Sequence, residues 1–145
     1  MREMAAERDM SILELSRSAE QSEFIDREID ARTARLGRES SDFVIDARLG
    51  WHFIPDSVRV FLEVRPDVAA LRVYEAGRGS EHENVDLAQT REAIESRTES
   101  ERKRYLNYYD LDYTDHSHYD LVVDTSEKTI DEVVAAILEH VRQRQ

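Results

Sequence analysis

Apolar side chains recur along the chain with two different periods, and the change of period separates predicted helices from predicted strands. Within residues 22–38, apolar positions follow helical spacing and charged residues stand between them. Much of this segment, in particular its I-D-R-E-I-D-A-R portion, is therefore expected to face water or a ligand. Ahead of it, two short helices are predicted, and the second begins at a capping box formed by Ser11 and Glu14.

Three short apolar runs have the pattern of strands that are buried on both faces of a parallel sheet. They are D-F-V-I-D-A at residues 42–47, V-R-V-F-L-E-V at residues 58–64 and D-L-V-V-D at residues 120–124. Asp46 and Arg48 stand at the carboxyl end of the first run. Because open α/β sheets bind ligands at that edge, these two side chains are candidates for a site.

Helices are predicted between and after these strands. One starts at Pro66 and stops near Gly77, and a long one starts at the S-E-H-E capping box of residues 80–83. Thr129 and Glu132 cap the last helix. Strands that alternate with helices predict an α/β fold, a three-layer sandwich with a parallel sheet, and the length of 145 residues predicts one domain.

One face of the long helix carries a pattern that suits an anion. Arg97, Glu101 and Arg104 are spaced i, i+4 and i+7, so their side chains share a helix face. Two guanidiniums with a carboxylate between them form a clamp for a phosphate, because arginine presents its donors as a planar fork. The alternative interpretation is a solvated helix face with an internal salt bridge.

Composition narrows the classes of function. The formal net charge of −12 argues against binding to nucleic-acid polymers or anionic membranes, because both repel an acidic protein. No apolar run is long enough to span a bilayer, and the first residues lack the pattern of a signal peptide. The absence of cysteine predicts a cytoplasmic location. A small anionic ligand held by a local arginine cluster is compatible with all of these observations.

Four motifs occur in order along the chain. They are I-D-R-E-I-D-A-R at residues 25–32, V-I-D-A-R-L-G-W at residues 44–51, E-S-R-T-E-S-E-R-K-R-Y-L-N-Y-Y at residues 95–109 and Y-D-L-V-V-D-T-S at residues 119–126. Together they resemble the cytidylate kinase family, in particular its compact branch. The resemblance implies the fold of a P-loop nucleoside monophosphate kinase, and transfer of the γ-phosphoryl group of ATP, with Mg²⁺, to CMP or dCMP. Positioning and charge neutralisation carry such a reaction, so arginines and a metal ion are expected at the site.

The resemblance also implies roles for residues around the acceptor nucleotide. Arg2 resembles an arginine that contacts the CMP phosphate, and Arg48 matches an arginine that faces the same phosphate. Asp26 and Asp30 are candidates for reading the amino group of cytosine. Residues 1–40 are expected to form the acceptor-binding helices.

A second group of residues matches positions around the transferring phosphoryl group. Arg97 and Arg104 match lid arginines that close over this group, and they are the expected catalytic residues. Glu101 matches an acidic lid position that meets the ribose or braces the arginines, and Asp46 matches an acidic residue that holds Mg²⁺ through water. Residues 80–115 are expected to form the lid helix and its loop.

The sequence departs from the family pattern at the loop that binds the phosphates of the donor nucleotide. No G-x-x-x-x-G-K-[ST] segment occurs in residues 1–145, which otherwise form a single cytidylate-kinase-like domain. Without the N–H groups and the lysine of that loop, the β- and γ-phosphates of ATP lose their cradle. The chain is therefore expected to be a very poor kinase, with a fold that is incomplete at its N-terminus and lacks the first central strand.

Two accounts fit this departure. The chain is a fragment of a normal kinase, or it is a degenerate, non-catalytic homologue that binds nucleotide or a partner. An exposed sheet edge next to the missing strand could be covered by another chain, which predicts a homodimer or a heteromer. The family's E-G-R-L-A-G-W is D-A-R-L-G-W at residues 46–51, which is one residue shorter. The sequence therefore does not determine which base the acceptor nucleotide carries.

Overall fold

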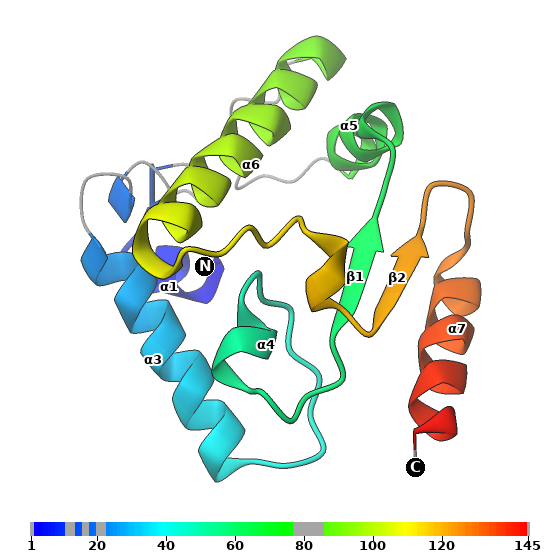
Figure 1. Cartoon of the computed structure of the whole chain (residues 1–145). Helices are drawn as coiled ribbons and strands as arrows, with labels where there is room; N and C mark the ends of the chain where they lie inside the picture. Colours follow the sequence, from blue (N-terminus) through cyan, green and yellow to red (C-terminus); the bar gives the residue numbers. More distant parts are fainter. Residues whose placement is uncertain (1, 11–13, 16–17, 20–22, 77–85, 145) are drawn as a thin grey trace.

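Two parallel strands, β1 (Val60–Glu63) and β2 (Leu121–Asp124), form the sheet of the structure (Figure 1). Their register places Val60 opposite Leu121. Neighbouring parallel strands cannot be joined by a tight turn, so the chain needs a long crossover between them. The described residues of that crossover form two helices and a 3₁₀ turn.

The structure, a computed structural model, describes residues 2–10, 14–15, 18–19, 23–76 and 86–144, without the side chains of residues 2, 3 and 23. The other elements, in chain order, are α1 (Arg2–Glu7), α3 (Glu23–Glu39), α4 (Gly50–Phe53), α5 (Pro66–Glu75), α6 (Leu87–Tyr109), the 3₁₀ helix η1 (His116–His118) and α7 (Ile130–Gln143). In Figure 1, α7 lies beside β2, α5 lies beyond the carboxyl end of β1, and the end of α6 meets the first turns of α3.

The strands predicted at residues 58–64 and 120–124 are confirmed in shortened form. The strand predicted at residues 42–47 is wrong, because this segment has no regular secondary structure and Val44 has a relative exposure of 101%. A strand needs a neighbour that pairs with its backbone groups. No described backbone hydrogen bond joins this segment to β1 or β2. Asp42 also has a left-handed φ of 57°, which interrupts an extended run at its start.

The described residues therefore form a mixed helix-and-strand fold around a two-stranded parallel sheet. This arrangement is compatible with the predicted α/β class. A full three-layer sandwich is not formed by the described part of the chain, and it stays a prediction. No helix in the described ranges is both long and apolar enough to cross a membrane.

Two helices, α5 and α7, start at the local signals that the sequence predicted. Pro66 lies in the first turn of α5, as predicted. At the start of α7, the backbone N–H of Glu132 donates to Thr129 Oγ1 (3.3 Å), and the backbone N–H of Thr129 donates to Glu132 Oε2 (2.8 Å). The predicted capping box of α7 is therefore confirmed.

The start of α6 differs from the prediction. Asp86 caps this helix and accepts a hydrogen bond from the backbone N–H of Gln89 (2.8 Å). The capping box predicted at residues 80–83, the stop at Gly77 and the capping box predicted at residues 11–14 lie wholly or partly outside the described residues. The long helix itself, which carries the predicted arginine clamp, is confirmed.

Two apolar clusters lie in the helical part of the molecule. The first consists of Met4, Ala5, Leu15, Ala19 and Ile25, and the second of Leu49, Tyr105 and Tyr113 with Trp51, Phe53, Tyr109 and Leu111 packed against them. The second cluster joins α6 to the segment around α4. At its edge the ring of Trp51 stacks on His118, with 4.7 Å between centroids and 20° between planes.

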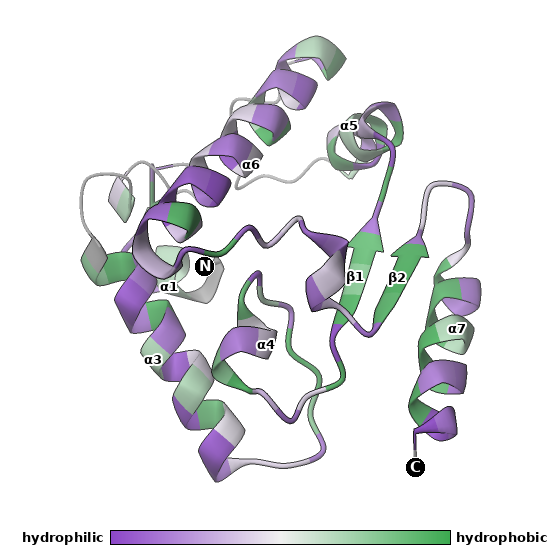
Figure 2. Ribbon diagram, viewed as in Figure 1, coloured by the Kyte–Doolittle hydropathy of each residue, from purple (hydrophilic) through white to green (hydrophobic). Residues whose placement is uncertain are grey.

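Hydropathy is distributed unevenly over these elements (Figure 2). The strands are apolar, whereas α6 is largely hydrophilic along its length. On α7 the apolar side chains are only partly covered, since Ile130 is 82% exposed and Val134 and Leu138 are each 46% exposed. The apolar core of the described residues is therefore small, and polar contacts position much of α6.

Candidate functional site

Polar side chains join α6 to α3. Arg104 Nε donates a hydrogen bond to Asp26 Oδ2 over 2.8 Å, and the two side chains are only 6% and 1% exposed. About one helical turn further along each helix, the Tyr109 hydroxyl donates to the Asp30 carboxylate. The charged α3 segment thus turns some of its carboxylates toward α6, while Arg32 pairs with Glu7 of α1 and Glu28 pairs with Arg8, just after α1.

Arg48 reaches the same region from the irregular segment before α4. Its Nε donates to Glu101 Oε2 over 2.9 Å, and its guanidinium carbon lies 5.7 Å from the centroid of the Tyr113 ring. Glu101 is 5% exposed, whereas the Arg48 side chain is 43% exposed. Arg48 is therefore fixed at one nitrogen by a buried carboxylate while part of its side chain stays open to solvent.

Burial shifts the acid–base properties of these groups. It raises the pKa of the Asp26 carboxyl, and the Arg104 guanidinium only partly offsets this effect. Burial also raises the pKa of Asp30 to about 6, against the lowering effect of the hydrogen bond from Tyr109. The pKa of Tyr113 rises to about 12 through burial and the charge of Glu101, while Arg48 and Arg97 lower it. Arg48 and Arg97 therefore both act on the same ring.

A cavity of about 530 Å³ runs along one face of α6. Its described lining residues recur every three or four positions: Ser96, Glu99, Ser100, Lys103, Arg104, Asn107 and Tyr108. This volume lies in the range of small-molecule sites. The lining presents two cations, hydroxyls and an amide, which can donate to a polar ligand, and one carboxylate, Glu99, which pairs with Lys103.

The structure brings together five of the predicted site residues: Asp26, Asp30, Arg48, Glu101 and Arg104. Their pairing differs from the clamp predicted within α6. Glu101 pairs with Arg48, and Arg104 pairs with Asp26, so each guanidinium finds its carboxylate on another element. The reason is burial, because buried charges need close partners of opposite sign.

The other predicted residues are placed less centrally. Arg97 lies on α6 and makes no ion pair with a described residue, although its charge lowers the pKa of Tyr113. Asp46 is exposed on the irregular segment and makes no hydrogen bond to a described residue. Arg2 belongs to α1, and its side chain lies outside the described part of the structure.

Five lining residues of the cavity were missed by sequence reasoning: Ser96, Glu99, Ser100, Lys103 and Asn107. The signal that could have found them is their helical spacing, since they recur every three or four positions along the face that includes Arg104. The predicted arginine clamp lies on the neighbouring face of the same helix. The cavity shows that Arg104 is shared between the two faces.

A dedicated metal site is not found among the residues that the structure describes. No group of three or more His, Asp or Glu side chains in those ranges could hold a metal ion. Asp46 is a single exposed carboxylate, whereas Mg²⁺ usually takes one or two carboxylates together with substrate phosphates. The described residues also lack a glycine-rich loop for those phosphates, so they do not fit ATP with Mg²⁺ on their own.

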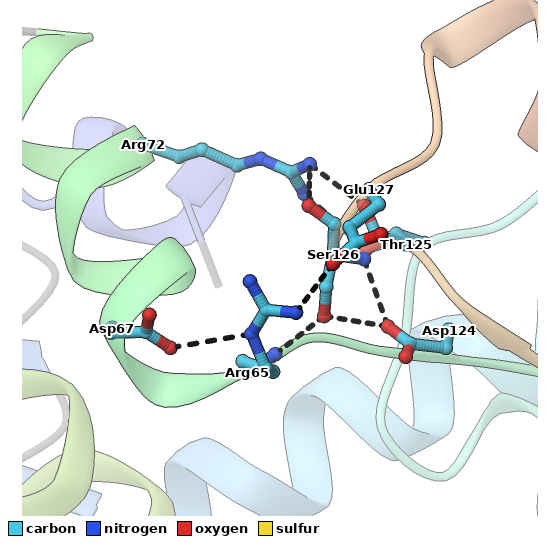
Figure 3. A network of polar contacts seen from close by, with 7 residues as sticks. All are labelled: Arg65, Asp67, Arg72, Asp124, Thr125, Ser126 and Glu127. Carbon is cyan, nitrogen blue, oxygen red and sulfur yellow. Dashed lines mark hydrogen bonds and ion pairs between the residues drawn. The ribbon is translucent and has the colours of Figure 1, made fainter.

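The carboxyl ends of β1 and β2 are closed by contacts within the protein (Figure 3). Ser126 donates to Asp124 Oδ1 through its backbone N–H (2.8 Å) and its hydroxyl (2.6 Å), and its Oγ accepts the backbone N–H of Arg65 (2.9 Å). Arg72 of α5 donates from Nη2 to the carbonyl oxygen of Thr125 (2.7 Å). This network ties α5 and the residue before it to the loop after β2.

The fold and this site define an α/β protein with a polar, ligand-sized cavity next to paired arginines. The chain matches the model of the cytidylate kinase-like family over residues 1–127 and belongs to that family. The predicted resemblance is therefore confirmed.

Named relatives support the same assignment. A cytidylate kinase of Methanothermobacter thermautotrophicus is 41% identical over 86% of this chain and 74% of its own length. The cytidylate kinase of Haloquadratum walsbyi is 38% identical over 86% of this chain and 63% of its own length, and that of Methanobrevibacter smithii is 35% identical over 94% and 76%. No solved structure matches the chain significantly.

Proposed function

We propose that the described residues bind CMP or dCMP as the acceptor of a phosphoryl group. The observation that carries the proposal is that two arginines from different elements are fixed at α6: Arg104, paired with Asp26, lines the cavity, and Arg48 is paired with Glu101. Each arginine uses Nε for its carboxylate, and a guanidinium has further N–H groups for phosphate oxygens. The family of the chain, whose named relatives are cytidylate kinases, supports a nucleotide as the ligand.

Other residues take proposed roles around this ligand. Asp30, half-buried on α3, is a candidate acceptor for the amino group of cytosine. Arg2 is a proposed further contact of the acceptor phosphate. Arg97 is a proposed second lid arginine, with α6 and the following loop as the lid.

Phosphoryl transfer from ATP, with Mg²⁺, is proposed only for a chain that also carries a P-loop. In such a chain, Arg97 and Arg104 would neutralise charge on the transferring group, and Asp46 would hold Mg²⁺ through water. The 145 residues contain no G-x-x-x-x-G-K-[ST] segment, so these residues are assigned the acceptor half of the reaction.

Titration calorimetry tests the proposal. CMP is expected to bind and ATP to give no heat, and Arg48→Ala is expected to weaken CMP binding at least about tenfold, since a hydrogen bond to a charged group contributes about 1.5–3 kcal/mol. Arg91→Ala is the matched control, because it also removes an arginine from an ion pair: Arg91 pairs with Glu95, and both are exposed on α6. If wild-type protein gives no heat with CMP, the proposal is wrong.

Further properties of the whole protein stay predictions. We infer a cytoplasmic location and no binding to nucleic-acid polymers or membranes from the absence of cysteine and the net charge of −12. A homodimer through an exposed sheet edge is also predicted. A stable monomer in light scattering would contradict it.

A further inference from the structure

The guanidinium of Arg104 is fixed at two of its three nitrogens. Nε donates to Asp26 Oδ2 (2.8 Å), and Nη1 donates to Ser100 Oγ (2.6 Å) on the preceding turn of α6. The third nitrogen, Nη2, is buried and has no hydrogen-bond partner among the described residues. Two fixed nitrogens determine the plane of a guanidinium and hence the direction of the third.

The ion pair with Asp26 is made through one oxygen only. Asp26 Oδ1 is buried and, like Nη2, has no hydrogen-bond partner among the described residues. Arginine and carboxylate often pair through two parallel hydrogen bonds. Because this pair uses one hydrogen bond, it neutralises charge and orients the guanidinium while Nη2 stays available to a further acceptor.

The cavity along α6 gives a direction from which such an acceptor can approach. Arg104 and Ser100 both line it, together with Lys103 and Glu99, which form an ion pair of 3.6 Å between Nζ and Oε1. The Arg104 side chain is only 6% exposed, so a hydrogen bond from Nη2 would form away from bulk water, where charge-assisted hydrogen bonds are stronger. An anionic oxygen is the acceptor that best matches these donors.

We propose that Asp26 and Ser100 are positioning residues that hold Arg104 so that its Nη2 group binds the phosphate of the acceptor nucleotide. This inference rests on the proposed function, since it takes CMP as the ligand. It assigns to Asp26 a role that differs from reading the cytosine base. Asp26 acts on the ligand through Arg104, and Ser100 fixes the second nitrogen of the same group.

The two possible roles of Asp26 predict different losses of ligand binding in the variant Asp26→Asn. If Asp26 reads the base, Asp26→Asn weakens the binding of cytidine and of CMP by the same factor. If Asp26 positions Arg104, the substitution leaves cytidine binding unchanged and weakens CMP binding, because only CMP carries the phosphate. The ratio of the two dissociation constants therefore separates them, and a general loss of structure would not change this ratio selectively.

The experiment measures dissociation constants of CMP, cytidine and inorganic phosphate for the wild-type chain, Asp26→Asn and Ser100→Ala. We expect the preference for CMP over cytidine to fall about tenfold or more in Asp26→Asn, and by a smaller factor in Ser100→Ala. Asp112→Asn is the matched control, because it removes a similar carboxylate. Asp112 Oδ2 accepts a hydrogen bond of 2.7 Å from Nε of Arg102, which lies on α6 like Arg104. Ser100→Ala carries the test if Asp26→Asn fails to fold.

Four outcomes are distinguishable. A selective loss for CMP in both variants supports the inference. A preference for CMP that is retained in both variants overturns it and leaves the proposed function standing. If the wild-type chain binds phosphate in an Asp26-dependent way but does not bind CMP, the proposed function is wrong and the positioning role stands. If neither CMP nor phosphate binds, both are overturned.

Discussion

Asp26 and Asp30 lie one helical turn apart on α3, yet their carboxylates face different partners. Asp26 meets a guanidinium, whereas Asp30 accepts a hydrogen bond from the neutral Tyr109 hydroxyl. Burial raises the pKa of both carboxyls, and at Asp30, where the hydrogen bond from Tyr109 opposes this effect, the pKa still rises to about 6. This single residue should therefore couple the stability of the α3–α6 contact to pH.

The predicted pH dependence has a definite sign. Because the pKa of Asp30 is about 6 in the folded state and ordinarily 3.8, the folded state binds more protons between about pH 4 and pH 6. The contribution of Asp30 to the free energy of unfolding is complete below pH 4 and is lost as the pH rises through 6. Asp30→Asn should remove this trend, so the wild-type free energy minus that of the variant should be larger at pH 4 than at pH 7.

Urea unfolding at several pH values measures this difference. Asp56→Asn, at an exposed turn, serves as the control for the loss of one carboxylate away from the α3–α6 contact. A constant difference between wild type and Asp30→Asn would contradict the predicted role of burial at Asp30.

Single residues also show what sequence reasoning could reach at the site. The i, i+4, i+7 pattern correctly placed Glu101 and Arg104 on a helix at a charged site, because that relation is local. It could not give their partners, since Arg48 and Asp26 are distant in sequence and only the fold brings them to α6. The roles of these residues in binding stay predictions.

Between elements, one close approach fixes how α3 meets the residues after α4. A Cβ atom built on Gly37 would lie 2.7 Å from Cγ1 and 3.0 Å from Cγ2 of Ile54. Glycine costs about 1 kcal/mol relative to alanine inside a helix, so its presence in α3 has a steric reason rather than a helical one. The contact lets α3 lie against the segment that carries Arg48.

Gly37→Ala is expected to lower the free energy of unfolding by about 1–3 kcal/mol, because the overpacking cost exceeds the gain in helix propensity. In an Ile54→Ala background the same substitution should instead stabilise the protein by up to about 1 kcal/mol, since the clashing atoms are gone. Urea unfolding of the four proteins in this cycle measures both effects. If Gly37→Ala changes the free energy of unfolding in the same direction in both backgrounds, the contact with Ile54 is not the cause of the destabilisation.

The elements that the sequence predicted best are those with local signals. The capping box at Thr129 and the proline start at Pro66 depend on neighbouring residues, and both are confirmed. The apolar run at residues 42–47 has the composition of a strand but finds no pairing strand in the described structure. Strand formation depends on a partner elsewhere in the fold, and a local pattern cannot supply that information.

At the scale of the whole molecule, net charge opposes compactness. The chain carries a formal charge of −12, and its exposed ion pairs are of the kind that contribute little to stability. The three-layer sandwich was inferred from the alternation of elements, which describes order along the chain. Alternation does not determine how many strands join one sheet, and this explains why only the helix-and-strand class is confirmed.

The melting temperature is predicted to rise between low and physiological ionic strength, because salt screens the repulsion among excess carboxylates more than it weakens the exposed ion pairs. Calorimetric or circular-dichroism melting curves over a NaCl series measure this trend. Glu92→Gln, which removes one exposed negative charge, should show a smaller rise. A melting temperature that falls with salt would mean that the ion pairs dominate.

The stacked pair of Trp51 and His118 has a practical consequence, because Trp51 is the only tryptophan of the chain. All indole fluorescence therefore originates from one ring, which packs against the cluster that contains Tyr105 of α6. A ligand that moves α6 should change the emission of this ring without any attached dye. The intrinsic fluorescence of Trp51 can therefore be used to detect ligand binding near α6.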